Sequence, residues 1–317
     1  CDGLRGRLHG VIAPAVTPFR ADGTLDLDAV YENAAFLVAH GVTALAPCGT
    51  VGEFASLTLE ERETVLEHTL RAAGGKALVI AHVSATDEAS MLRLARHAAD
   101  AGADAALVLP PYYFRLNDDE LLAFFRWLDK TLPLPFLVYN NPATTGMSIT
   151  DKHLETLIDM PRFAGVKEGH PDVLRFHRLV RRFGAEAPII AANESQLAFF
   201  LLSGARSLMT SGVAYAPELF AALLDAASRR DVDETWRWFD HILALRQPMM
   251  PALQRGYPAY IPYTKLGVEL RGLRAGAPRP PLRPVDPPGR EAFEKAVREH
   301  VLPLATSRIT NPGGCRS

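Results

Sequence analysis

The chain has 317 residues, of which 48% are hydrophobic and 22% are charged, and its formal net charge is -2. This composition is typical of a folded protein and excludes an intrinsically disordered one. The near-zero charge gives no electrostatic reason to expect a nucleic acid or an anionic membrane as a partner. No apolar run approaches the roughly 20 residues of a membrane span, so no membrane association is expected.

Three cysteines, Cys1, Cys48 and Cys315, are too few and too widely spaced for a disulfide scaffold or a zinc ribbon. We therefore expect a reducing, cytoplasmic location. The chain begins with Cys1 and lacks the apolar stretch of a signal peptide. We interpret this start as trimming; the alternative is a mature lipoprotein.

Short apolar runs typical of buried strands alternate with longer amphipathic stretches typical of helices. The expected strands are Val11–Val16, Ala44–Ala46, Ala77–His82, Ala105–Leu109, Phe136–Tyr139, Phe163–Lys167, Ile189–Ala192 and Ser207–Thr210. The expected helices are Leu27–His40, Leu59–Ala73, Asp87–Ala101, Asp118–Leu132, Asp151–Met160, Val173–Phe183, Gln196–Ser203 and Glu218–Ser228.

Helix boundaries are marked by local signals. Thr58 with Glu61, and Asn117 with Glu120, have the spacing of capping boxes. Gly41, Gly102 and Gly204 follow helices, where a left-handed cap favours glycine.

Eight strand–helix units in succession predict an α/β fold, a (β/α)8 TIM barrel over residues 1–228 that carries the active site. No GxGxxG follows the first strand, which disfavours an open dinucleotide-binding sheet. Residues 229–317 predict a C-terminal helical extension, with helices at Glu234–Leu245, Ile261–Leu270 and Glu291–Val301. We expect an irregular connector at Ala275–Pro288 and a frayed tail from Thr306.

Active sites of such barrels lie at the carboxyl ends of the strands, and Lys167 ends the sixth strand. A buried lysine loses its charge readily, and a neutral amine can attack a carbonyl carbon to form a Schiff base. The alternative is a surface lysine just past the strand, paired with Glu168.

Tyr139 ends the fifth strand, and its phenol could relay a proton. Alternatively it is a half-buried aromatic with a satisfied hydroxyl. Thr50 lies in a glycine-flanked turn after the second strand, where exposed backbone N–H groups favour a carboxylate. A tight turn that needs glycine for its backbone angles is the other interpretation.

Taken in order, the motifs GTVGE at Gly49, YNNP at Tyr139 and GVKEG around Lys167 resemble the dihydrodipicolinate synthase and N-acetylneuraminate lyase family. The resemblance runs from about Gly10 to about Pro281 and includes PAVTPF and RPPL. It implies a class I aldolase-type lyase without a metal or other cofactor. In that mechanism Lys167 forms a Schiff base with a pyruvate-type 2-oxo acid.

The resemblance also implies roles for further residues. Tyr139 would shuttle a proton with Thr50 as relay, and Tyr113 would complete this relay from a neighbouring subunit. A homo-oligomer, a dimer or tetramer, is therefore expected. The backbone at Gly49, Thr50 and Val51 would hold the substrate carboxylate.

The chain departs from the family pattern at two positions. Val51 stands where many members have a second threonine, and Thr144 stands where the lysine-biosynthesis synthase has an arginine. Asn193, Glu194 and Ser211 follow the seventh and eighth strands, where sialic-acid lyases bind a polyhydroxylated chain. They are substrate-binding candidates, although loops are polar in any case.

Other chemistries find little support. The sequence has no HExxH or GxSxG motif, so no metal site or serine hydrolase is expected, and Cys48 is expected to be a small buried residue. We expect cleavage, condensation or dehydration of a 2-keto-3-deoxy acid. The alternatives are a deaminase of a hydroxyproline-derived imino acid, 4-hydroxy-tetrahydrodipicolinate synthase, or a catalytically silent binding or regulatory protein.

Overall fold

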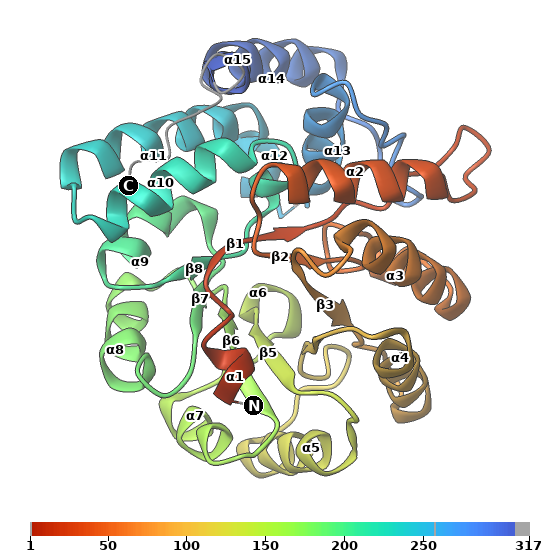
Figure 1. The fold of residues 1–317 in the computed structure, drawn as a ribbon, viewed down its shortest axis with the longest axis vertical. Coiled ribbons are helices and arrows are strands. Elements are labelled where there is room, and N and C mark those ends of the chain that lie inside the picture. Colours follow the sequence, from red (N-terminus) through yellow and green to blue (C-terminus); the bar gives the residue numbers. More distant parts are fainter. Residues whose placement is uncertain (1, 257, 308–317) are drawn as a thin grey trace.

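The computed structural model describes residues 2–256 and 258–307. Eight parallel strands pair in chain order, β1 to β8, and β8 closes onto β1 to form a barrel (Figure 1). The strands are β1 Gly10–Pro14, β2 Ala44–Ala46, β3 Leu78–His82, β4 Ala105–Val108, β5 Phe136–Asn140, β6 Phe163–Glu168, β7 Ile189–Ala191 and β8 Ser207–Leu208. The predicted (β/α)8 fold is thus confirmed, with strand ends shifted by one or two residues.

The barrel has two separate apolar cores, because successive side chains of a strand point to opposite faces. Residues such as Ile12, Ile80 and Leu137 fill the barrel interior, and Leu8 from the N-terminal segment closes its base. Their strand neighbours face outward and pack against the ring of helices. A side chain is therefore either inside the barrel or in the outer core, and this choice decides which residues can form a site.

The helices around the barrel lie close to the expected ranges. They are α2 Leu27–Ala39, α3 Leu59–Ala73, α4 Glu88–Ala101, α5 Asp118–Thr131, α7 Asp151–Ile158, α8 Val173–Phe183, α9 Leu197–Leu202 and α10 Pro217–Ser228. Both predicted capping boxes form, at the start of α3 and of α5. Gly41, Gly102 and Gly204 have φ angles of +78°, +92° and +110°, as expected for glycines that end helices.

Residues beyond α10 form a helical layer over α9 and α10, seen at the top of Figure 1. It comprises α11 Val232–Arg246, α12 Met250–Gln254, α13 Tyr260–Leu270, α14 Pro287–His300 and α15 Leu302–Ser307. The predicted connector ends earlier than expected, because Asp286 caps α14 and prolines are tolerated in a first helical turn. The predicted frayed tail falls mostly on residues 308–317, outside the described range; Thr306 and Ser307 end α15.

Four short α-helices of the described residues were not expected from the sequence: α12 and α15, given above, and α1 and α6. α1, Asp2–Arg5, lies under the base of the barrel, and α6, Pro142–Thr145, follows β5. Within residues 2–256 and 258–307, no helix has both the length and the apolar character needed to cross a membrane.

Candidate active site

Lys167 points into the barrel because β6 carries a bulge. The register between β5 and β6 shifts after Phe136, so that Leu137 pairs with Gly165 and Ala164 is an extra residue. Ala164 faces the interior, whereas Val166 lies in the outer core, which turns Lys167 inward again. Gly165 makes this possible: its φ is +155°, and a Cβ there would stand 2.8 Å from the carbonyl oxygen of Pro188.

The Lys167 amine lies in an almost dry environment. The residue is 8% exposed, and its Nζ lies 3.9 Å from the centroid of the Tyr139 ring, which stands beside it on β5. Burial lowers the pKa of Lys167 from 10.5 to about 7. A large fraction of the amine is therefore neutral, and hence nucleophilic, near neutral pH.

Glu168 does not pair with Lys167. It points to the opposite face of β6, where both its oxygens accept hydrogen bonds from the Asn140 amide at 2.7 and 3.0 Å. Arg175 donates to the same carboxylate at 3.1 Å. The surface-pair interpretation of Lys167 is thus wrong, and the Asn and Glu of the YNNP and GVKEG motifs serve to lock β5 to β6.

Tyr139 keeps its phenolic proton over a wide pH range. Burial raises its pKa above the ordinary value of 10, and the nearby phenol of Tyr260 and the carboxylate of Glu168 add to the effect. Tyr260, at the start of α13, is a neighbour that the sequence motifs did not indicate. The arrangement provides a protonated hydroxyl next to a neutral amine.

The turn after β2 is held rigidly. Cys48 and Glu53 adopt positive φ angles of 54° and 55°, and the Gly52 carbonyl accepts a hydrogen bond from the Thr17 hydroxyl at 2.7 Å. The Glu53 carboxylate is buried against Lys265 Nζ at 2.8 Å and also accepts the backbone N–H of Arg279. The RPPL segment that begins at Arg279 therefore serves to anchor this turn.

Within the turn, the residues differ in their environment. Thr50 is half-buried, and its hydroxyl makes no hydrogen bond to another described residue. The Val51 side chain packs in the outer core, so only the backbone of Val51 contributes to the turn. Gly49 is buried, and its carbonyl accepts the N–H of Phe54 at 3.3 Å.

Burial raises the pKa of the Cys48 thiol to about 12, so this cysteine is a poor nucleophile.

Tyr113 is not part of the cluster around Lys167 within one chain. Its side chain is 80% exposed and packs edge-on against Phe114, which is itself exposed. The neighbouring Tyr112 is half-buried and faces Phe54.

The residues after β7 and β8 form a second polar cluster. The Ser211 hydroxyl donates to the buried Glu194 carboxylate at 2.9 Å, and the Arg246 guanidinium lies 3.5 Å from the same oxygen. Asn193 instead donates to the Gly169 carbonyl, just after β6, and accepts the backbone N–H of Ser195. Arg246 comes from α11, and no sequence motif indicated it.

His82, at the end of β3, is another functional candidate that the sequence motifs missed. It is 4% exposed, and its Nε2 lies 3.2 Å from the Ser84 hydroxyl. Burial, followed by the charges of Arg62 and Lys167, lowers the pKa of His82 well below its usual 6.5. The imidazole is therefore neutral, and it lies close enough to the Lys167 amine for the charge of that amine to affect its pKa.

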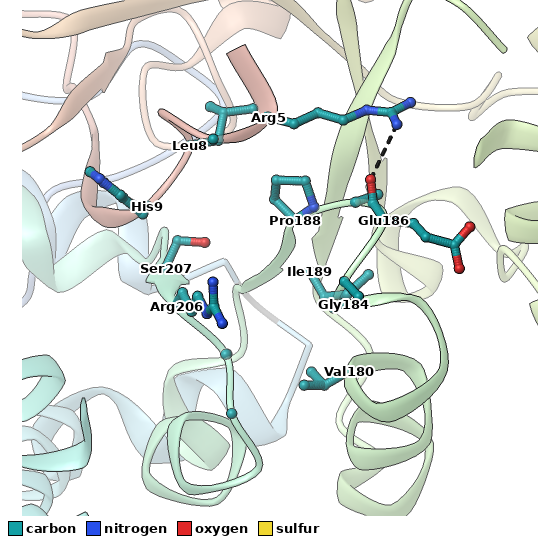
Figure 2. Close-up of a pocket in the computed structure, with 15 residues that line it drawn as sticks. Arg5, Leu8, His9, Val180, Gly184, Glu186, Pro188, Ile189, Arg206 and Ser207 are labelled. Carbon is teal, nitrogen blue, oxygen red and sulfur yellow. Dashed lines mark hydrogen bonds between the residues drawn. The ribbon is translucent and has the colours of Figure 1, made fainter. Parts of the chain in front are cut away.

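One cavity lies at the other end of the barrel. Figure 2 shows this pocket, whose volume is about 410 Å³. The N-terminal segment and the starts of β7 and β8 line it. Arg5 crosses its edge and donates to the carbonyl oxygens of Glu186 and Phe163. Because Lys167 stands at the carboxyl end of its strand, this pocket is not the place of the lysine chemistry.

In the described part of the chain, no three His, Cys, Asp or Glu residues gather in a way that could hold a metal ion.

Comparison with known proteins is consistent with this geometry. Residues 7–300 match the model of the dihydrodipicolinate synthetase family. The chain belongs to this family. It is 34% identical over 287 residues to an uncharacterized DapA-like lyase of Halobacterium salinarum, covering 90% of this chain and 92% of that protein.

Two further relatives represent different activities within the dihydrodipicolinate synthetase family. A 4-hydroxy-tetrahydrodipicolinate synthase of Phenylobacterium zucineum is 32% identical and covers 92% of this chain and 97% of its own. The structure of Proteus mirabilis N-acetylneuraminate lyase superposes with a TM-score of 0.83 at 29% identity, covering 91% of this chain and 98% of its own. The chain is thus a lyase of this family, and the relatives differ in the substrates their names imply.

Proposed function

We propose that this lyase acts on a pyruvate-type 2-oxo acid through a Schiff base on Lys167. The observation that carries the proposal is the buried amine, whose pKa is about 7, at the carboxyl end of a barrel strand and 3.9 Å from the Tyr139 ring. The family relationship to an N-acetylneuraminate lyase supports it.

The chemistry would proceed in balanced steps. Neutral Nζ attacks the C2 carbonyl, and loss of water with gain of one proton gives a cationic iminium. For cleavage, the C4 hydroxyl loses a proton, the iminium accepts the electron pair of the C3–C4 bond, an aldehyde leaves and C3 of the enamine gains a proton. For dehydration, C3 loses a proton, the iminium accepts that electron pair, and the C4 hydroxyl gains a proton and leaves as water. In both cases water then hydrolyses the Schiff base and returns the Lys167 amine. Tyr139 would move the proton to or from these oxygens, with Thr50 as relay and Tyr113 of a neighbouring subunit completing it.

Substrate recognition would divide between two regions. The backbone of Gly49, Thr50 and Val51 would hold the carboxylate, and Asn193, Glu194 and Ser211 would meet the hydroxylated remainder. The Glu194–Ser211 pair beside Arg246 fits hydroxyl groups, because the Glu194 carboxylate is a charged acceptor and the Arg246 guanidinium is a donor. This favours a 2-keto-3-deoxy acid as the substrate class.

Borohydride reduction in the presence of pyruvate tests the proposal directly. We expect one reduced pyruvate adduct per chain, located by peptide mass spectrometry on Lys167. A screen of 2-keto-3-deoxy acids, with a hydroxyproline-derived imino acid alongside, would then identify the reaction. No adduct with any of these compounds would instead indicate a catalytically silent member.

The rate of trapping should depend on pH in a defined direction. Only the neutral amine attacks, so with a pKa of about 7 we expect kcat/KM to fall about tenfold per pH unit below that value. The measurement is kcat/KM, or the initial trapping rate, from about pH 5 to about pH 10.5, which spans both the lowered and the ordinary pKa of a lysine. A rate that keeps rising until pH 10 would show that Lys167 has an ordinary pKa and would contradict the burial argument.

Condensation of pyruvate with aspartate semialdehyde is expected to be negligible. The resemblance implies that the synthase holds the distal carboxylate of its substrate with an arginine where this chain has Thr144. The Thr144 hydroxyl already accepts a hydrogen bond from Asn141 at 2.8 Å. A neutral hydrogen bond contributes about 1 kcal/mol and a charged one about 1.5–3, so this loss alone costs about tenfold in affinity, and Val51 in place of a second threonine weakens the match further.

Arg115 is the residue that could overturn this prediction. Its Nε lies 3.0 Å from where a Cβ on Gly146 would stand, so it lies against the same segment as Thr144. A coupled assay on the wild type and on Arg115→Ala separates the cases. Efficient condensation, with kcat/KM of about 10⁴ M⁻¹s⁻¹ or more, that is lost in the variant would show that Arg115 binds the distal carboxylate.

A further inference from the structure

The hydrogen bonds around His82 favour one tautomer of its neutral ring. Ser84 Oγ accepts the backbone N–H of Leu109 at 2.7 Å and lies 3.2 Å from His82 Nε2. Because this hydroxyl already accepts one hydrogen bond, we assign its own proton to the contact with Nε2. Nε2 is therefore the accepting nitrogen, and the single proton of the neutral ring sits on Nδ1.

The Nδ1–H group of His82 is therefore left without an acceptor. It is buried and has no hydrogen-bond partner within residues 2–256 and 258–307. Arg62 donates to the backbone carbonyl oxygens of His82 and Ser84 at 2.6 and 2.9 Å, which holds the backbone, and Phe54 packs against the imidazole with the ring centroids 4.5 Å apart. A buried donor without an acceptor is costly, and its retention calls for an explanation such as a ligand.

The position of His82 indicates which ligand atom would accept. Leu78 and Ile80, at two-residue spacing on the same strand, lie in the barrel interior, so His82 faces inward at the same end as Lys167. Phe54, its ring partner, belongs to the turn that contains Thr50. The imidazole therefore stands at the same end of the barrel as that turn and Lys167, and the charge of Lys167 contributes to the lowered pKa of His82.

We propose that His82 Nδ1–H donates a hydrogen bond to the carboxylate of the 2-oxo acid bound at Lys167. This rests on the proposed Schiff-base function. The carboxylate is bonded directly to the carbon that Nζ attacks, so it must lie close to both groups. A neutral donor suits this place, because a second cation would oppose the positive charge that Nζ acquires on becoming an iminium.

Borohydride trapping with two probes tests the contact. Pyruvate carries the carboxylate, whereas methyl pyruvate presents the same ketone with an uncharged ester. For His82→Phe, which keeps a ring against Phe54 but has no N–H, we expect the half-saturating pyruvate concentration to rise about tenfold or more, with methyl pyruvate within about threefold of wild type. His82→Asn, which restores a donor, should recover much of the loss. His177→Phe, at an exposed position on α8, is the matched control and should leave both probes unchanged.

Each other outcome contradicts the proposal. Equal losses for both probes would mean that His82 acts on the lysine or on the fold, and an unchanged pyruvate response would exclude the contact. If His82→Phe fails to fold, Ser84→Ala keeps the imidazole but removes the hydroxyl that fixes its proton, and a selective weakening of pyruvate is still expected. Failure of wild-type trapping with pyruvate would instead overturn the proposed function itself.

Discussion

Lys167→Ala is expected to abolish turnover while the fold survives. The variant has no amine to form the iminium, and no other described lysine faces the barrel interior beside Tyr139. The substitution removes no ion pair, because Glu168 is held by Asn140 and Arg175. It also removes an amine whose charged form is disfavoured by burial. Steady-state assays with the identified substrate, together with circular dichroism, provide the measurement.

Lys167→Arg is the informative companion variant. It has a side chain of similar length, but the guanidinium stays protonated and cannot attack a carbonyl, so it should be as inactive as the alanine variant. Lys265→Arg is unsuitable as a control, because Lys265 Nζ anchors the Thr50 turn through Glu53. Retention of even a tenth of the wild-type rate in purified Lys167→Ala would refute the assignment of the nucleophile.

The barrel could be predicted from the sequence because its signals are local and repeated. Apolar runs of strand length, capping boxes such as Thr58 with Glu61, and helix-ending glycines each report on a few adjacent residues. Strand-end reasoning likewise singled out Lys167 and Tyr139, which the structure brings into contact. Such signals do not depend on which strands meet across the barrel.

What the sequence could not provide depends on long-range contacts. Strict alternation through Phe163-Ala-Gly-Val-Lys puts Lys167 on the face opposite to Ala164, and the bulge at Gly165, which depends on pairing with β5, reverses this. The role of Arg279 was hidden for a similar reason, since it acts on Glu53, more than two hundred positions earlier.

The same limit applied to candidate site residues. His82 appeared as one of several scattered histidines, because its tautomer is fixed by Ser84 and Leu109 and its neighbour Lys167 lies on another strand. Arg246 reaches Glu194 from a helix outside the eight barrel units. Both residues could be found only once the strands and helices were placed together.

Tyr139→Phe is expected to lower kcat about a hundredfold or more, the usual effect of losing a general acid–base group. The phenylalanine ring preserves the surface that Lys167 Nζ contacts at 3.9 Å, so burial of the amine and its pKa of about 7 should persist. Only the hydroxyl disappears. Because burial raises the pKa of that hydroxyl, it is protonated at neutral pH and can donate to a leaving oxygen.

Separating adduct formation from turnover makes this prediction sharp. Borohydride trapping with pyruvate should continue in Tyr139→Phe, since the nucleophile is intact, whereas release of product should be slow. Tyr260→Phe is the matched control: its phenol lies near Tyr139 and is also buried enough to have a raised pKa, but it belongs to α13 and not to a strand end. We expect a much smaller effect there. If the two variants lost equal activity, proton transfer would be shared by the pair; if Tyr139→Phe kept its kcat, Tyr139 would have no part in the mechanism and the neutral amine would need another proton carrier.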